Sequence, residues 1–225
     1  MTLLIFDCDG VLVDSELIAL EVLADMLGDL GWPISPSECR TRFMGKATPE
    51  VLFEIEAGLG RPVPPDFGEE MKARLFARLR RELQPVRHIR EVISALPYPV
   101  CVASSSQPER IALSLEVTGL ASLFEGRVFS AAEVRHGKPA PDLFLHVASR
   151  LAVAPREAIV IEDSPVGVIA ARRAGMGVIG FAGGSHADAT LTNLLAGAGA
   201  QEMLTQMRDL PEAIERLRTN SAAAP

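Results

Sequence analysis

Hydrophobic and polar positions change their pattern twice along the chain. Residues 3–6 form an apolar run that ends abruptly in acidic residues, a pattern typical of a strand, here about residues 2–6, that is buried on both faces of a parallel sheet. Between residues 15 and 85 apolar residues recur every three or four positions, which predicts helices and no strand. After residue 85 short apolar runs alternate with helical patterns. The sequence therefore predicts an α/β fold, a doubly wound parallel sheet interrupted by an all-helical insert.

The expected boundaries follow from this change of pattern. We assign residues 1–14 and 86–225 to the α/β core and residues 15–85 to the helical insert. Beyond the insert we expect strands at 98–103, 128–129, 158–161 and 177–181, helices at 109–117, 142–151 and 166–174, and a loop over the Ala/Gly-rich residues 196–200.

Composition narrows the class of protein. The chain has 225 residues, of which 48% are hydrophobic and 23% charged, as in a soluble globular enzyme. A net charge of −7 without a basic stripe argues against nucleic-acid binding, and no apolar run reaches the roughly 18 residues of a membrane span. Scattered cysteines and the lack of a visible signal segment favour a reducing compartment. We therefore expect a cytoplasmic monomer that contacts neither nucleic acid nor membrane.

Two carboxylates directly follow the first strand. Asp7 and Asp9 are one residue apart, and such groups repel each other unless a cation or proton neutralises them. Open parallel sheets bind their ligands at the carboxyl ends of the strands, where these acids lie. We interpret them as half of a site for magnesium and phosphoryl transfer.

Three further polar motifs lie at strand ends or in loops of the predicted core: Ser104-Ser105-Ser106, Gly137-Lys138-Pro139 and Glu162-Asp163. Each alone also fits a helix cap or a solvated turn. Together they supply hydroxyl and backbone donors for phosphate, a cation, and carboxylate ligands for Mg²⁺. Their order and strand context favour a single phosphoryl-transfer site.

The motifs together resemble the haloacid dehalogenase superfamily, in the subfamily with a helical cap after the first motif. The likeness extends from residue 3 to about residue 186. It is most specific in Gly-Lys-Pro-Ala-Pro-Asp at 137–142 and Ile-Glu-Asp-Ser-Pro-Val-Gly at 161–167. Within the superfamily the chain is most similar to sugar-phosphate phosphatases and β-phosphoglucomutase-like proteins.

The resemblance implies a covalent mechanism. Asp7 would be the nucleophile and form an aspartyl-phosphate. Asp9 would protonate the leaving sugar oxygen, then deprotonate the attacking water, and its backbone carbonyl would ligate Mg²⁺. Dehalogenases and phosphonoacetaldehyde hydrolases resemble this chain but lack an acid at the position of Asp9, so its presence favours phosphate esters.

The other motif residues receive roles by the same resemblance. Ser104 and the N–H of Ser105 would bind phosphate, and Lys138 would bridge the nucleophile and the phosphate. Asp163 would be a magnesium ligand, and Glu162 either a ligand or a neighbour of one.

The cap supplies weaker candidates for substrate contact. In relatives, the loop that here contains Gly45 and Lys46 faces the core, while for Arg42 a solvated surface role is favoured over substrate contact. β-Phosphoglucomutase-like sequences have an arginine for a second phosphate three residues after the glycine. This chain has Thr48 there, which favours hydrolysis over a mutase reaction.

The sequence thus predicts a magnesium-dependent phosphatase for a small phosphorylated sugar. A hexose-phosphate mutase remains an alternative, as does a phospho-acceptor protein that holds phosphate on Asp7 without turnover. His186 and His136 are expected to serve in turns or face solvent rather than to take part in chemistry.

Overall fold

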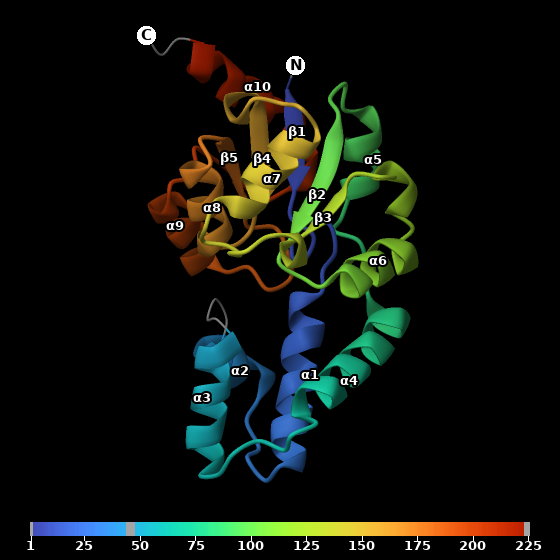
Figure 1. Ribbon diagram of the computed structural model, residues 1–225, viewed down its shortest axis with the longest axis vertical. Coiled ribbons are helices and arrows are strands. Elements are labelled where there is room, and N and C mark those ends of the chain that lie inside the picture. Colours follow the sequence, from blue (N-terminus) through green and yellow to red (C-terminus); the bar gives the residue numbers. More distant parts are fainter. Residues whose placement is uncertain (1, 44–47, 223–225) are drawn as a thin grey trace. The chain divides into compact units, whose positions relative to one another are not determined.

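The computed structural model describes residues 2–43 and 48–222 (Figure 1). These residues form two compact units, Met1–Asp14 with Gln84–Pro225, and Ser15–Leu83. The first unit contains the sheet and the second is helical wherever it has regular structure in its described residues. Among the described residues, none of the helices combines the length and apolarity needed to cross a bilayer.

The sheet has six parallel strands in the order β3-β2-β1-β4-β5-β6. This confirms the predicted doubly wound fold. The strands are β1 Leu3–Phe6, β2 Val100–Ser104, β3 Val128–Ser130, β4 Ala158–Glu162, β5 Gly177–Phe181 and β6 Glu202–Leu204.

Strand β1 is the centre of the sheet and is buried on both faces. Its residue Phe6 pairs with Val102 of β2 on one side and with Ile161 of β4 on the other. Leu3 and Ile5 pack in a buried apolar cluster, while Leu4 and Phe6 are also fully buried. An uninterrupted apolar run is what a strand covered on both faces requires.

Helices flank this sheet (Figure 1). Phe144 and Val168, from two of these helices, belong to the same apolar cluster as Leu3 and Ile5. The expectation of a loop over residues 196–200 is wrong in part, because a helix extends through Ala198 before Gly199 ends it with a φ of 108°. The core helices are α5 Ile89–Ala95, α6 Pro108–Val117, α7 Asp142–Arg150, α8 Pro165–Arg173, α9 Ala189–Ala198 and α10 Leu210–Ala222.

The helical unit consists of α1 Glu16–Asp29, α2 Pro36–Phe43, α3 Thr48–Leu59 and α4 Phe67–Glu82. Helix α1 packs against α2 and α4. Arg78 of α4 forms an ion pair with Glu21 of α1 at 2.5 Å. Trp32 and Phe43 meet edge to face with ring centroids 6.4 Å apart.

The chain leaves and re-enters the sheet unit at adjacent points. The N–H of Asp14 donates to the carbonyl of Gln84 at 3.0 Å, and the N–H of Val86 donates to the carbonyl of Leu12 at 3.0 Å. Val13 and Pro85 form an antiparallel bridge between the two segments. The ends of the helical insertion are therefore joined by backbone hydrogen bonds.

Candidate active site

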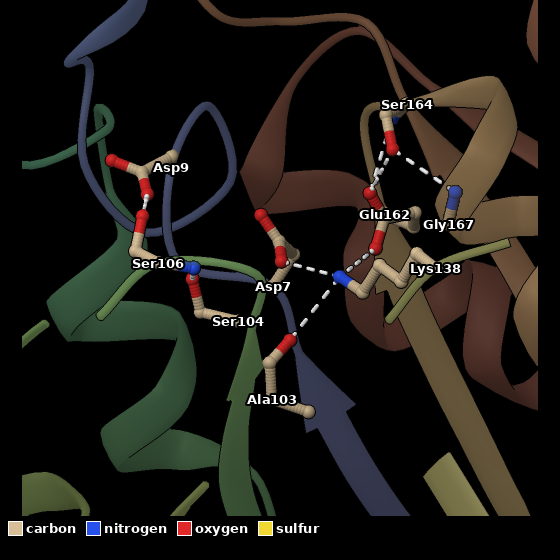
Figure 2. A network of polar contacts seen from close by, with 9 residues as sticks. All are labelled: Asp7, Asp9, Ala103, Ser104, Ser106, Lys138, Glu162, Ser164 and Gly167. Atoms are coloured by element: carbon tan, nitrogen blue, oxygen red, sulfur yellow. Dashed lines mark hydrogen bonds and ion pairs between the residues drawn. The ribbon is translucent and has the colours of Figure 1, made fainter. Parts of the chain in front are cut away.

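The motif residues gather where neighbouring strands end (Figure 2). Asp7 directly follows β1, Ser104 is the last residue of β2, and Glu162 is the last residue of β4. The N–H of Asp7 donates to the carbonyl of Ile161 at 3.0 Å, which continues the pairing of β1 with β4. Because the strands are parallel, their carboxyl ends lie at one edge of the sheet. Motifs that are far apart in the sequence therefore lie close together in space.

Lys138 links these strand ends. Its Nζ lies 2.6 Å from Asp7 Oδ1, 2.7 Å from Glu162 Oε2 and 3.2 Å from the carbonyl oxygen of Ala103 (Figure 2). Burial alone would lower the pKa of this amine, but the carboxylates of Asp7 and Glu162 outweigh burial and raise it. Lys138 is therefore a buried amine whose charged form is favoured by the two carboxylates beside it.

Asp7, Glu162 and Asp163 form a buried acidic cluster, with one potential ligand atom of each within 4.8 Å of the others. Burial raises the pKa of Asp7 well above its usual range; Lys138 opposes this shift, and the two other acids add to it. Burial likewise raises the pKa of Asp163 to about 6. One ammonium group does not balance three carboxylates, so the cluster fits a divalent cation with oxygen ligands.

Glu162 is fixed by the start of helix α8. Its Oε1 accepts hydrogen bonds from the Ser164 hydroxyl at 2.6 Å and the Ser164 N–H at 3.2 Å. The Ser164 hydroxyl also accepts from the N–H of Gly167 at 3.1 Å and so caps the helix. A Cβ at Gly167 would lie 2.0 Å from the Glu162 carboxyl carbon, so only glycine leaves room for this acid.

Asp9 is held by one residue of the predicted serine motif, Ser106, and by Arg110, which the sequence analysis did not identify. The hydroxyl of Ser106 donates to Asp9 Oδ2 at 2.6 Å, and Arg110 of α6 contacts Asp9 Oδ1 at 2.7 Å. Figure 2 shows the Asp9 carboxyl group turned toward Ser106. The position of Arg110 in the first turn of the helix after Ser104 was the available sequence signal.

Hydrogen bonds hold the backbone of the turn after β2 in place. The Ser104 hydroxyl is buried and accepts a hydrogen bond from the N–H of Ser106 at 3.0 Å. The carbonyl of Ser106 accepts from the Ser130 hydroxyl at 2.7 Å. Ser105 is exposed at the same strand end, ahead of helix α6.

His186 has the predicted place in a turn and, in addition, a contact that was not predicted. It lies in a turn, as expected, closed by a hydrogen bond from the N–H of Ala187 to the carbonyl of Gly184 at 3.0 Å. Its imidazole, however, is buried, and Nε2 lies 3.1 Å from Asp163 Oδ2. His136 is exposed, as expected, and contacts Asp142 at 3.0 Å.

The residues of the helical unit that were predicted to contact substrate are only partly described by the structure. Gly45 and Lys46 lie outside the described residues. Arg42 is exposed near the end of α2, and its guanidinium carbon lies 5.6 Å from the centre of the Trp32 ring. This contact accounts for its position through packing on an aromatic face.

Comparisons with known proteins agree with this geometry. The family model for haloacid dehalogenase-like hydrolases matches residues 4–181. The 6-phosphogluconate phosphatase of Escherichia coli K12 is 29% identical over 182 residues, which cover 80% of this chain and 82% of that protein. The phosphorylated carbohydrates phosphatase of Thermotoga maritima is 34% identical over 181 residues, covering 78% and 82%.

Solved structures extend the likeness over nearly the whole chain. A conserved haloacid dehalogenase-like protein of unknown function from Agrobacterium tumefaciens C58 is 37% identical, with a TM-score of 0.88. The match covers 97% of this chain and 99% of that one. The predictions of the superfamily and of an enzyme are thereby confirmed. Motif order, fold and matched length agree, and the chain belongs to the haloacid dehalogenase-like hydrolase family.

Proposed function

We propose that this hydrolase is a magnesium-dependent phosphatase that removes phosphate from small phosphorylated sugars through an aspartyl-phosphate on Asp7. The observation that carries the proposal is the buried contact of Lys138 with both Asp7 and Glu162, beside Asp163. This arrangement supports Asp7 as the nucleophile, with the ammonium group of Lys138 and potential metal ligands close to it. The named phosphatases among the relatives support the reaction class.

In the first half of the reaction, Asp7 attacks the phosphorus atom and the bond from phosphorus to the sugar oxygen breaks. Asp9 gives its proton to the departing oxygen after turning from Ser106 and Arg110 toward the phosphoryl group. In the second half, water attacks the phosphorus atom of phospho-Asp7 and Asp9 accepts its proton. Inorganic phosphate leaves and Asp7 is regenerated.

The donors around Asp7 stabilise the charge that develops on the transferred group. Lys138 holds Asp7 Oδ1 in place and offers its ammonium protons to a phosphoryl oxygen. The Ser104 hydroxyl and the N–H of Ser105 bind further phosphate oxygens. Such preorganised donors contribute most where water is excluded, as it is around the buried Lys138.

The acidic cluster fits Mg²⁺ by its chemistry and its excess negative charge. Asp7, Asp163 and the backbone carbonyl of Asp9 would be its ligands. Both carboxylate oxygens of Glu162 already accept hydrogen bonds. This supports a position of Glu162 next to the metal ligands, without direct binding of the metal. When bound, the ion supplies positive charge that offsets the phosphoryl oxygens.

The substrate assignment rests on the relatives and on one residue of the helical unit. The two phosphatases compared above are named for phosphorylated carbohydrates or a sugar acid phosphate. Thr48 replaces the arginine expected in a mutase, which supports hydrolysis of a monophosphate. We assign the helical unit the role of a cap that reads the sugar, with Gly45, Lys46 and Arg42 as candidate contacts.

The test is release of inorganic phosphate from a panel of sugar monophosphates that includes 6-phosphogluconate, with and without Mg²⁺. Asp7→Asn should lower turnover by about 10⁴-fold or more, because the nucleophile is lost. Equal rates for wild type and Asp7→Asn would refute the proposal. Isomerisation of glucose 1-phosphate with little phosphate release would indicate the mutase, and a phosphorylated Asp7 that persists without turnover would indicate the phospho-acceptor.

A further inference from the structure

His186 reaches the acidic cluster from a neighbouring strand. It lies in the loop between β5 and α9, and β5 is adjacent to β4, which carries Glu162 at its end. The loop after β5 therefore opens at the same edge as Asp163. The imidazole is only 4% exposed, and its Nε2 lies 3.1 Å from Asp163 Oδ2.

The loop that carries His186 is anchored on both sides. The N–H and hydroxyl of Ser185 donate to Asp14 Oδ1 at 3.1 and 2.7 Å. Asp188 caps helix α9 by accepting from the N–H of Thr190 at 2.9 Å. The position of the imidazole is thus set by the backbone, and the contact with Asp163 does not depend on a freely moving loop.

Two glycines make space for this pair of side chains. A Cβ at Gly10, whose φ is +79°, would lie 1.8 Å from Asp163 Oδ2 and 3.0 Å from His186 Cε1. A Cβ at Gly184 would lie 2.8 Å from the same imidazole carbon. Any larger residue at Gly10 would displace Asp163, so the strand β1 loop is shaped around this carboxyl group.

We infer that His186 is a positioning residue that holds the Asp163 carboxylate for cation binding through a hydrogen bond from Nε2 to Oδ2. The inference rests on the metal site of the proposed function. A carboxylate oxygen only accepts, so Nε2 carries the proton. With Oδ2 held by the imidazole, the other carboxylate oxygen would be available as a ligand for a cation. Removing such an outer hydrogen bond typically lowers metal affinity 10- to 100-fold.

A matched pair elsewhere in the same unit provides the control. His136 contacts Asp142 at 3.0 Å, close to the 3.1 Å of His186 and Asp163. The His136 pair is largely exposed and lies outside the acidic cluster. Replacing His136 therefore removes the same kind of contact without touching a candidate ligand.

The experiment measures Mn²⁺ affinity directly, from the electron paramagnetic resonance signal of the free ion, without substrate. The variants are His186→Leu, His186→Gln, His186→Asn and His136→Leu, with Asp163→Asn as the reference for a lost ligand. The glutamine amide nitrogen reaches about as far as Nε2, whereas that of asparagine reaches only about as far as Nδ1. Thermal unfolding of each variant reports whether it is folded.

We expect His186→Leu and His186→Asn to raise the Mn²⁺ dissociation constant about 10- to 100-fold, and His186→Gln to restore most of the affinity. His136→Leu should leave it unchanged. Wild-type affinity in both His186→Leu and His186→Asn would overturn the inference, as would equal loss in the glutamine and asparagine variants, since packing would then explain it. Absence of Mn²⁺ binding by the wild type would refute the metal site of the proposed function itself.

Discussion

Lys138 in the sheet unit and Arg78 in the helical unit each contact two carboxylates at similar short distances, and Arg78 also lies 3.8 Å from a third, that of Asp25. Lys138 lies 2.6 and 2.7 Å from Asp7 and Glu162, and all three side chains are at most 9% exposed. Arg78 lies 2.5 and 2.7 Å from Glu21 and Glu82, but these partners are 45% and 40% exposed. Distance alone therefore does not distinguish the two networks. Solvent exposure does. Water screens the ion pairs of Arg78, whereas loss of Lys138 would leave buried carboxylates without a partner.

Among substitutions that test this difference between the two networks, Lys138→Met should have the largest effect on stability and turnover. The substitution leaves the buried carboxylates of Asp7 and Glu162 without their ammonium partner. We expect a loss of about 3 to 5 kcal/mol in the free energy of unfolding at pH 8. Phosphatase turnover should fall by at least about 10²-fold as the phosphoryl charge loses a donor. Urea unfolding and phosphate release measure the two effects.

A double variant serves as the control for this substitution. Lys138→Met combined with Asp7→Asn removes one of the orphaned charges and should recover part of the stability but none of the activity. If Lys138→Met unfolds at the same urea concentration as the wild type, burial does not set the strength of this network.

A second prediction concerns pH. Folding raises the pKa of Asp163 from 3.8 to about 6, so the folded protein binds a proton that the unfolded chain releases between these values. The associated stability is present below pH 3.8 and is lost as the pH rises through 6. In EDTA, Asp163→Asn should therefore unfold at a higher temperature than the wild type at pH 8, and its free energy of unfolding should be greater by about 3 kcal/mol.

This difference should shrink as the pH falls toward 4, because Asp163 is then protonated in the folded wild type. Thermal unfolding followed by circular dichroism between pH 4 and pH 8 gives the profile. A difference that stays constant with pH would show that the charge on Asp163 is not the cause.

The pair of Arg110 with Asp9 is intermediate, with side chains 22% and 12% exposed. Arg110→Met should leave the Asp9 carboxyl group less well oriented. We expect alkyl phosphates to lose about tenfold in turnover, part of the 10²- to 10⁴-fold that general acid catalysis contributes. p-Nitrophenyl phosphate should lose less, because its leaving group does not require a proton. Equal loss for both substrates would exclude an effect through Asp9.

The smallest effect is expected from Arg78→Met. Its partners are solvated, so the free energy of unfolding should fall by less than about 1 kcal/mol, and the difference should diminish further in 1 M salt. Turnover of phosphate esters should not change. A loss as large as that of Lys138→Met would remove the distinction between the two networks.

The sequence predicted those parts of the site whose signal is local. Asp7, Ser104 and Glu162 each end or follow an apolar strand, and parallel topology then brings them together. The contacts of Arg110 with Asp9 and of His186 with Asp163 were not predicted, because these partners lie far apart along the chain and no periodicity reports such a contact. Strand β6, Glu202–Leu204, was missed because three residues are too few to show a pattern.

The backbone pairing of Asp14 with Gln84 and of Leu12 with Val86 has a consequence for how this molecule can be altered. The two segments that flank the insertion are hydrogen-bonded to each other, so a short turn can join them. Residues 15–83 can therefore be exchanged for another insertion without a change in the order of the strands. Such an exchange would leave the strand ends that carry Asp7 and Glu162 in place.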